Sequence, residues 1–398
     1  MSSVYGLNVP NDWEVVALDQ IKSDEKKALI SGPFGSNISA KYFTPTGVPV
    51  IRGNNLSLDV FIRFKENGFV FVSPEKADEL GAWAQADDII FTAVGTLGQI
   101  GLLSDNQDYP RYIISNKQIR LRLNQEKVTP QFVYYWLASD LMQEVIEQRN
   151  TGSSVPLINL GVVKNLLIPL PPLPEQKAIA SVLSSLDDKI DLLHRQNKTL
   201  EAMAETLFRQ WFIEEAKEDW EVSSLGDVVK IAYGKNLPTS RLLDSGYPVF
   251  GGNGQIGFYD RFLYSEPQVL VSCRGEASGK VNISLPNSFI TNNSLVLERK
   301  ENGISFEYLK FYALAYDFGL HVSGSAQPQI TIDGLFNAEF RWPPLDLVES
   351  FTEVVRPLED KRLTNYVQIQ TLENLRDTLL PKLMSGEVRV QYQTEEVA

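Results

Sequence analysis

The stretch PLPPLPEQKAIASVLSSLDDKIDLL, residues 169–193, places four prolines directly before a long segment that contains none. Proline cannot continue a strand ladder, but it fits the first turn of a helix. The stretch is therefore expected to end a globular domain and to begin a long helix. A second corner, RWPPLDLVESFTEVVRPLEDKRL, begins at Arg341, and its Pro-Pro-Leu lies 172 positions after the first, from 171 to 343. The chain is thus expected to build the same corner twice.

Each corner is followed by apolar residues at a spacing of seven, which predicts a helix with a heptad stripe. Each helix should span about 35 residues, or about 50 Å, and Gly386 should end the second one. Asn365 takes the position equivalent to Leu193, where a polar residue sets the register of a seam at some cost in stability. The stripe predicts a seam between the two helices, formed by Ile179, Leu186, Leu193, Leu200, Leu207, Phe351, Leu358, Leu372 and Leu379. The alternative is that each helix simply lies on its own domain.

The segments before the two corners repeat each other in order. NDWEVVALDQI at 11–21 matches EDWEVSSLGDV at 218–228, and GVPVIRGNN at 47–55 matches GYPVFGGNG at 246–254. Short runs such as VPVIRG, GFVFVS and DDIIFTAVG are β-branched or aromatic and bounded by turn residues, so they predict strands. The segment from Thr129 to Gln148 predicts one helix with Pro130 in its first turn.

The expected fold is α+β, with two repeated α/β domains separated by two long antiparallel coiled-coil helices in a pseudo-twofold arrangement. The expected boundaries are a first domain at 1–170, a central helix at 171–215, a second domain at 216–345, a C-terminal helix at 346–386 and a tail at 387–398.

Composition restricts the possible classes of protein. The net charge of −13 argues against nucleic-acid binding, because phosphate contacts require Lys and Arg, but a local basic face can exist on an acidic protein. No apolar run reaches the length of about 18 residues that a membrane span needs. The N-terminus lacks a basic start and an apolar stretch, so no signal peptide is expected. The single cysteine, Cys273, excludes an intrachain disulfide and fits a cytoplasmic location.

The order of these elements resembles the specificity subunit of type I restriction-modification systems. The resemblance is carried by PLPPLPEQKAIASVLSSLDDKIDLLHRQNKTLEAMAETLFRQWF at 169–212, by LENLRDTLLPKLMSGEV at 372–388, and by a Trp and a Leu five residues apart near the start of each half. It implies two target-recognition domains that each read one half of a split double-stranded DNA site. It also implies conserved helices that set the spacing and bind two modification (methyltransferase) subunits. The second corner departs from the motif, because Asp346, Leu347 and Val348 replace Pro-Glu-Gln.

The resemblance further implies a chain without chemistry of its own. S-adenosylmethionine, ATP and Mg²⁺ would then belong to the modification and restriction subunits of the complex. The inventory of reactive side chains also favours a chain without catalytic chemistry. The chain has only two histidines, and neither Cys273 nor His194 has partners at metal-ligand spacing. The Glu-x-Lys at 298–300 matches the spacing of metal-dependent nucleases, but it is also typical of a solvated strand end. GGNGQIG at 251–257 is expected to be a loop that brings backbone close to a ligand.

Candidates for DNA reading are amide and basic side chains at corresponding places in the two repeats, because Arg, Lys, Asn and Gln read base edges while Lys, Ser and Thr hold phosphates. Each position alone is also typical of a turn. In the first domain they are Asn37, Lys41, Arg52, Asn54, Asn55, Thr96, Asn116 and Lys117; in the second they are Lys235, Asn236, Asn253, Gln255, Arg274, Lys280, Asn292 and Asn293.

The rival hypothesis is a non-catalytic scaffold that assembles proteins through its heptad helices, and the negative charge favours it.

Overall fold

The computed structural model describes residues 2–300, 303–324 and 327–391. The chain forms two compact units. Unit 1 is built from the chain up to Leu192 together with the chain from Gln368 onward, and unit 2 runs from Leu193 to Val367. The last part of the predicted tail, 392–398, lies outside the described residues. Among those that are described, no helix is both long and apolar enough to cross a membrane.

Two four-stranded sheets form the centre of unit 1, and the predicted strands at VPVIRG, GFVFVS and DDIIFTAVG are confirmed as β5, β6 and β8. The first sheet is antiparallel, in the order β4 (Leu29–Ser31), β11 (Gln118–Leu121), β8 (Ile89–Thr92) and β9 (Ile100–Leu102). The second sheet has the order β6 (Val70–Val72), β5 (Val48–Ile51), β10 (Tyr112–Ile114) and β7 (Trp83–Ala84), and its β5–β10 pair is parallel.

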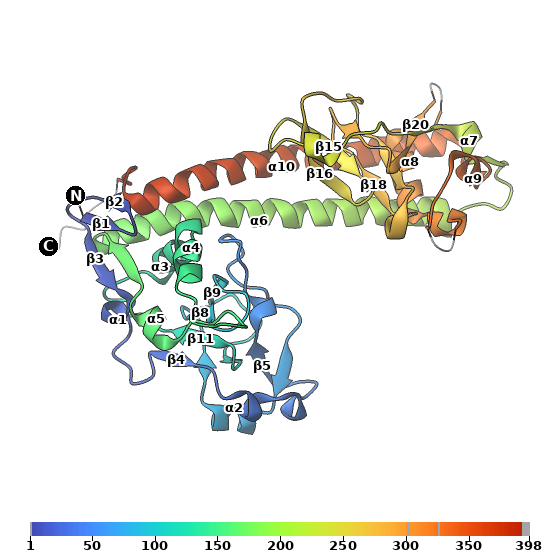
Figure 1. The fold of residues 1–398 in the computed structure, drawn as a ribbon. Coiled ribbons are helices and arrows are strands. Elements are labelled where there is room, and N and C mark those ends of the chain that lie inside the picture. The colour runs from blue at the N-terminus through green and yellow to red at the C-terminus, as the bar shows by residue number, and fades with distance from the viewer. Residues whose placement is uncertain (1, 301–302, 325–326, 392–398) are drawn as a thin grey trace. The chain divides into compact units, whose positions relative to one another are not determined.

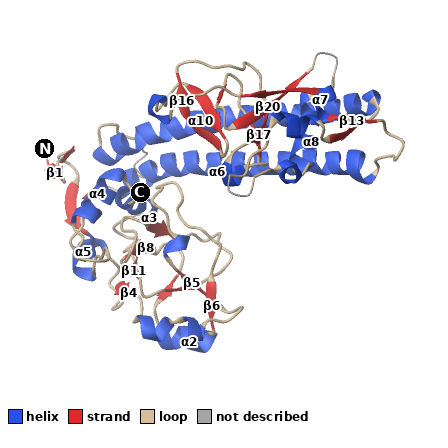
Figure 2. Ribbon diagram, turned by 45° about the vertical axis from the view of Figure 1, so that its right-hand side comes forward, coloured by secondary structure: helices blue, strands red, loops and turns tan. Residues whose placement is uncertain are grey.

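Short elements complete unit 1. They are the hairpin of β1 (Ser2–Val4) and β2 (Leu7–Val9), the pair of β3 (Glu14–Ala17) and β12 (Leu167–Leu170), and the helices α1 (Leu18–Ile21), α2 (Pro74–Leu80), α3 (Pro130–Leu137), α4 (Asp140–Gln148) and α5 (Leu160–Lys164). Figures 1 and 2 both show α2 at the end of the unit farthest from the long helix α6 (Leu173–Arg209).

The prediction of a single helix from Thr129 to Gln148 is wrong, because the segment forms two helices. Pro130 does begin α3, but the helix ends at Leu137, and α4 starts anew after Ser139, whose extended backbone interrupts the helical path. The apolar periodicity continues through this break, because both helices bury a face in the same core. A pattern of burial alone could not locate the break.

Unit 2 repeats the topology of unit 1. Its antiparallel sheet has the order β14 (Val229–Tyr233), β20 (Ser294–Arg299), β17 (Val269–Ser272) and β18 (Val281–Ile283), and its second sheet has β16 (Gly254–Tyr259), β15 (Tyr247–Gly251) and β19 (Phe289–Ile290), with β15 and β19 parallel. The pair of β13 (Val222–Ser224) and β21 (Glu339–Arg341) and the helices α7 (Leu225–Val228), α8 (Phe306–Ala315) and α9 (Ile332–Phe336) complete it. The repeat predicted from the sequence is therefore present in the fold.

The two proline corners begin the two long helices, as predicted. They are α6, which a five-residue π-helical turn at Gln210–Glu214 extends, and α10 (Leu345–Ser385). Gly386 follows α10 with a φ of 71°, a conformation that glycine adopts at little cost, and thereby ends the helix.

Within each unit the two helices run in opposite directions side by side (Figure 1). In unit 1 an Asp187 oxygen lies 3.6 Å from an Arg376 nitrogen, and Glu175, earlier on α6, reaches Arg389 beyond the end of α10. In unit 2 Glu201 pairs with Arg362 at 2.7 Å.

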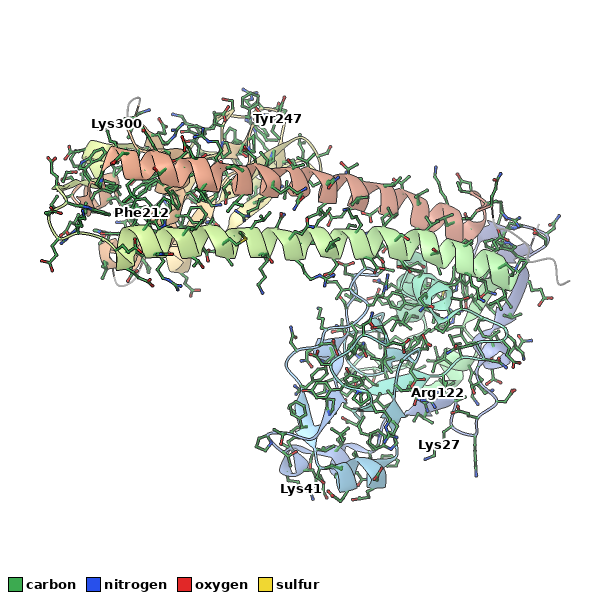
Figure 3. All side chains as sticks on the ribbon, turned by 180° about the vertical axis from the view of Figure 1, so that it is seen from behind. Lys27, Lys41, Arg122, Phe212, Tyr247 and Lys300 are labelled. Atoms are coloured by element: carbon green, nitrogen blue, oxygen red, sulfur yellow. The ribbon has the colours of Figure 1, made fainter. Side chains whose placement is uncertain are left out.

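Residues of both long helices pack into the hydrophobic cores of the two units, as the alternative expected. In unit 1, Ile179 of α6 and Leu383 of α10 belong to the same core as the sheet; in unit 2, Phe208 of α6 and Phe351 of α10 do so. Figure 3 shows Phe212 at the end of α6, where its ring centre lies 5.2 Å from that of Phe351. Of the predicted seam residues, Ile179, Leu193 and Phe351 are buried, and Leu186, Leu200, Leu207, Leu358, Leu372 and Leu379 are partly buried.

Candidate nucleic-acid interface

Three loops of unit 1 meet at a cavity of about 530 Å³. They follow β5, follow β8, and connect β10 to β11. Because β5 and β10 are parallel neighbours, the turns at their carboxyl ends come together at one edge of the sheet. Of the eight residues predicted to read DNA in this domain, five line the cavity: Arg52, Asn54, Thr96, Asn116 and Lys117.

The cavity combines cations with amide and hydroxyl groups. Arg52 and Lys117 are the charged side chains among the residues that line it, and no carboxylate lies among them. Thr92, Gln99 and Gln118 add polar groups, while Ile38 and Val50 contribute apolar surface. Amides and guanidinium groups match the donors and acceptors of base edges, and lysine matches phosphate. On a chain with a net charge of −13, a cavity without carboxylates is a local site suited to an anion.

Hydrogen bonds to the backbone hold the first of these loops in place. Arg52 Nη2 donates to the Gly68 carbonyl at 2.7 Å, and Asn54 Nδ2 donates to the same oxygen at 3.3 Å. With its amide oriented so that both polar atoms are satisfied, Gln118 accepts from Gly53 N and donates to the Ile51 carbonyl, each at 3.2 Å. The loop therefore offers its remaining donors from a fixed position.

The prediction that Asn55 reads DNA is wrong. Asn55 is fully buried; its Oδ1 accepts from Arg52 N at 3.0 Å, and its Nδ2 donates to the carbonyls of Lys65 and Asn67 at 2.9 Å each. An amide with both ends bonded to backbone fixes the loop and has no group left for a base. Asn37 and Lys41 are exposed but do not line the cavity.

In unit 2, backbone hydrogen bonds connect the segments that carry the residues predicted to read DNA, at the place that corresponds to the unit 1 cavity. Asn292 N donates to the Lys235 carbonyl at 3.1 Å, Cys273 N to the Asn293 carbonyl at 2.9 Å, and Ser272 N to the Lys280 carbonyl at 2.9 Å. The candidates Lys235, Asn236, Asn253, Gln255, Arg274, Lys280 and Asn293 are exposed, and Asn292 is partly buried.

The glycine-rich segment at 251–257 is not the loop that the sequence suggested. Gly251 ends β15 and Gly254 begins β16, so the segment is a hairpin in which Gly252 and Asn253 form the turn. The Gly252 carbonyl accepts from Asn282 Nδ2 at 3.1 Å, which ties the turn to β18. Asn253 is thereby held beyond the end of β15, as Asn54 is beyond the end of β5.

A larger cavity in unit 2, of about 860 Å³, contains charges that neutralise one another. Lys310 pairs with Glu359 at 2.6 Å, Arg356 with Glu307 at 2.8 Å, and Arg362 with both Glu201 and Glu359. These cations already have carboxylate partners in the same unit. The pairs connect α8 to α10 and α6 to α10, so they hold these helices together. The cavity of unit 1 differs, since its cations have no carboxylate among the lining residues.

The residues that could suggest catalysis have other roles. Glu298 pairs with Lys230 at 2.7 Å and accepts from Tyr264 Oη at 2.8 Å, whereas Lys300 donates to the carbonyls of Gly226 and Asp227 at 2.8 Å each, so the two do not form one site. Cys273 is buried, and burial raises the pKa of its thiol. Within the described part of the chain, no group of three or more His, Cys, Asp or Glu is placed to hold a metal ion.

Comparison with known proteins identifies the family. A family model described as the type I restriction modification DNA specificity domain matches residues 10–202 and again 217–365. The chain belongs to this family. It is 27% identical to the type I restriction enzyme MjaIX specificity subunit of Methanocaldococcus jannaschii, over 96% of this chain and 95% of that protein. It is 21% identical to the HindI specificity subunit of Haemophilus influenzae, over 76% and 86% of the two chains.

A solved structure shows the same fold. The crystal structure of the type I restriction-modification system S subunit from M. genitalium aligns with a TM-score of 0.66 at 20% identity, over 96% of this chain and 99% of that one.

The first proline corner holds two buried polar side chains, Glu175 and Gln176, whose structural role sequence reasoning missed. Glu175 is fully buried; it accepts from Trp13 Nε1 at 3.2 Å and pairs with Arg389 at 2.5 Å. Gln176 is 1% exposed and caps the backbone N–H of Thr129 at 3.0 Å. The signal that could have revealed this role is the pair of polar residues, Glu-Gln, in the first turn of a helix that otherwise begins with apolar residues and prolines.

The departure at the second corner has a visible consequence. Leu347 stands in the place of Glu175, and the indole nitrogen of Trp220 is buried without a hydrogen-bond partner among the described residues. Trp220 occupies the position in the second repeat that Trp13 has in the first. The second corner thus lacks this pair of buried polar side chains and relies on apolar packing of Leu347 against the unit 2 core.

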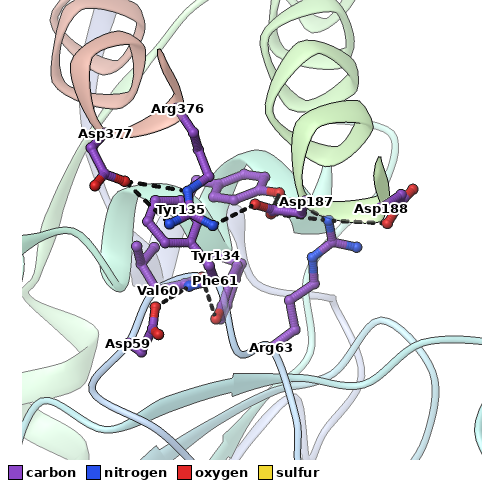
Figure 4. Close-up of polar contacts among 10 residues, drawn as sticks. All are labelled: Asp59, Val60, Phe61, Arg63, Tyr134, Tyr135, Asp187, Asp188, Arg376 and Asp377. Carbon is purple, nitrogen blue, oxygen red and sulfur yellow. Dashed lines mark hydrogen bonds and ion pairs between the residues drawn. The ribbon is translucent and has the colours of Figure 1, made fainter. Parts of the chain in front are cut away.

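A second buried network ties the recognition domain of unit 1 to both long helices (Figure 4). Tyr135 Oη donates to Asp187 on α6, and Arg63 donates to Tyr135 Oη at 2.9 Å and to Asp187 at 3.3 Å. Arg376 on α10 lies 3.6 Å from the other Asp187 oxygen. Burial raises the pKa of Asp187, and the two arginines and the tyrosine oppose that shift.

Proposed function

We propose that the chain is the non-catalytic specificity subunit of a type I restriction-modification complex and reads a bipartite double-stranded DNA site, one half with each repeat. The observation that carries the proposal is the equivalent placement of amide and basic residues in the two repeats. In unit 1 these residues line a cavity without carboxylates at the ends of β5, β8 and β10. In unit 2 the matching loops meet beyond β15, β17 and β19.

The long helices would set the spacing of the half-sites and carry two modification subunits. Their opposite directions within each unit support an antiparallel coiled coil, and the repeated strand order supports a pseudo-twofold relation. The recognition domains at 1–170 and 216–345 would then read DNA, while the helices at 171–215 and 346–386 would hold the partners.

Methylation and cleavage would belong to the partner subunits, together with S-adenosylmethionine, ATP and Mg²⁺. The separate structural roles of Glu298, Lys300 and Cys273 support this division of labour. The names of the curated relatives, which are specificity subunits, support it as well. The complex, with restriction subunits where the system has them, would act on DNA in the cytoplasm.

Matched double substitutions test the reading of two half-sites. Asn116→Ala with Lys117→Ala changes the first repeat, and Asn292→Ala with Asn293→Ala changes the equivalent positions of the second. Methylation mapping of the assembled complex defines the target, and binding is then scanned over every base pair of both half-sites. Each double variant should lose discrimination in one half only, by about 1–3 kcal/mol for each base contact removed. Equal losses in both halves from either variant would show that these residues serve the fold or general phosphate binding instead.

A further inference from the structure

Phe34 is the most exposed of the large hydrophobic side chains in the described part of the chain, at 83%. Large aromatic side chains usually bury most of their surface, so a ring this exposed is a candidate for a contact with another molecule when its neighbours suit one. It lies in the loop after β4, with Pro33 before it and Gly35 after it.

The loop holds Phe34 in a defined position. Gly32 N donates to the Gln118 carbonyl at 2.9 Å, and a Cβ at Gly32 would lie only 1.8 Å from the Ser115 carbonyl oxygen, so glycine is required there. On the other side, Asn37 N donates to the Phe34 carbonyl at 2.8 Å, and the Ile38 side chain is buried in the core. The ring is therefore displayed between two anchored points.

Phe34 stands beside the cavity that we assign to DNA reading. A Cβ at the neighbouring Gly35 would lie 3.0 Å from Asn116 Nδ2, and Asn116 lines the cavity. Ile38, from the same loop, lines it as well.

Two cations lie beside Tyr42. Lys41 precedes it in the chain, and Lys76 on α2 also pairs with Glu79 at 2.7 Å. The ammonium groups of Lys41 and Lys76 stand 4.7 and 4.0 Å from the centre of the Tyr42 ring. Figure 3 shows Lys41 at the end of unit 1 opposite the part of α6 that belongs to this unit. An exposed aromatic ring on the same chain segment as Lys41, one residue from the glycine that lies beside Asn116, fits a ligand that combines flat apolar faces with negative charge, which describes nucleic acid.

We propose that Phe34 inserts against a base step of the first half-site and partly unstacks it. This inference rests on the proposed function and adds a recognition element that hydrogen bonding does not supply. An apolar wedge distorts DNA most easily at flexible pyrimidine–purine steps, so the residue selects for deformability as well as for sequence.

The second repeat builds the same loop without the ring. Gly234 N donates to the Ser294 carbonyl at 3.1 Å, and a Cβ at Gly234 would lie 2.2 Å from the Thr291 carbonyl oxygen, as for Gly32 in unit 1. Two residues after this glycine stands Asn236 in place of Phe34. The two halves of the site are therefore recognised by different means at this loop.

The test uses the chain assembled with its modification subunits and duplexes that carry 2-aminopurine at each position of the first half-site. The variants are Phe34→Ala, Phe34→Asn, which copies the second repeat, Phe34→Leu, which keeps apolar bulk without a flat ring, and Phe34→Trp, which keeps the ring. With Phe34 or Phe34→Trp, binding should raise the fluorescence at one base step. The Ala and Asn variants should lose this signal and bind roughly tenfold or more weakly, since stacking on an aromatic side chain contributes on this scale. Phe34→Leu should keep part of the fluorescence signal, because an apolar side chain can still enter the step, but it should bind more weakly than Phe34→Trp because it has no flat face for stacking.

Three other results would overturn the inference. The first is unchanged affinity and unchanged fluorescence in Phe34→Ala. In that case the proposed function would still stand if the Asn116 and Lys117 double variant lost discrimination at the first half-site. A Phe34→Ala chain that no longer assembled with its partner subunits would assign the ring to a protein contact. Leucine equal to tryptophan in both measurements would show a general apolar contact rather than stacking on a base. Failure of the Asn116 and Lys117 variant to change DNA binding would instead contradict the proposed function itself.

Discussion

The reciprocal exchange of Asn365 and Leu193 tests the pairing of the two long helices. The two residues occupy equivalent positions in the repeat, and both are buried, at 0% and 1% exposed. Asn365 Nδ2 donates to Asn197 Oδ1 at 2.9 Å and reaches Gln196 Oε1 at 3.4 Å, while its Oδ1 has no partner among the described residues. We expect Asn365→Leu to stabilise unit 2 and Leu193→Asn to destabilise it.

The magnitude follows from opposing contributions. Removing a buried unsatisfied carbonyl gains about 1–3 kcal/mol, and the better helix propensity of leucine adds about 0.5 kcal/mol. The lost hydrogen bonds cost about 1 kcal/mol each, and the larger side chain can cost a further ~1 kcal/mol or more in strain, which its apolar burial offsets. The net expectation for Asn365→Leu is a small gain of about 0.5 kcal/mol. Leu193→Asn loses buried leucine and adds an amide, so it should cost about 3 kcal/mol or more.

Urea unfolding followed by tryptophan fluorescence gives both changes in the free energy of unfolding. Because the chain has two units, amide hydrogen exchange should accompany it, and the change in protection should be localised to residues 193–209 and 345–367. Asn365→Ala is the control, since it removes the polar group without adding apolar bulk, and it should not reach the stability of Asn365→Leu. The reasoning fails if Asn365→Leu loses more than about 1 kcal/mol while Leu193→Asn is neutral.

Three further predictions concern buried groups. Burial lowers the pKa of Lys310, so between that lowered value and the ordinary one the unfolded chain binds more protons at this site than the folded chain. The contribution of Lys310 to stability should therefore rise with pH up to about 10, and urea titrations at several pH values should show Lys310→Met losing this part of the pH dependence relative to the unsubstituted chain. Burial raises the pKa of the Cys273 thiol, so iodoacetamide at pH 8 should label the native protein far more slowly than the urea-unfolded chain; comparable rates would contradict its placement. Glu175→Leu copies the second corner and leaves the Trp13 N–H without its acceptor, which should cost about 1–3 kcal/mol of unfolding free energy, whereas Glu175→Gln keeps an acceptor and should cost less.

Much of the fold follows from local patterns in the sequence. The prolines at 171–174 and 343–344 begin the long helices, Gly386 ends the second, and β-branched runs form strands in the expected places. These features depend on the conformational preferences of residues close together in the chain, and the repetition of the whole series made the two-unit architecture predictable.

The candidate site was predictable only as a set of loops. Arg52, Asn54, Thr96, Asn116 and Lys117 do meet at one cavity, because the repeat marked their segments and the sheet brings those segments together. Whether they read DNA stays a prediction. Asn55 has the same residue type and the same loop as Asn54, and sequence alone could not separate an amide bonded to two carbonyls from one that faces solvent.

Local patterns were enough to predict which segments become strands and helices, where the corners lie and that the series occurs twice. Which polar groups form hydrogen bonds inside the fold could be seen only in the folded chain. Glu175 and Asn55 became structural because strands and loops from elsewhere in the chain supply their partners. Burial and hydrogen-bond partners depend on segments distant in the sequence, and only the folded chain places those segments next to one another.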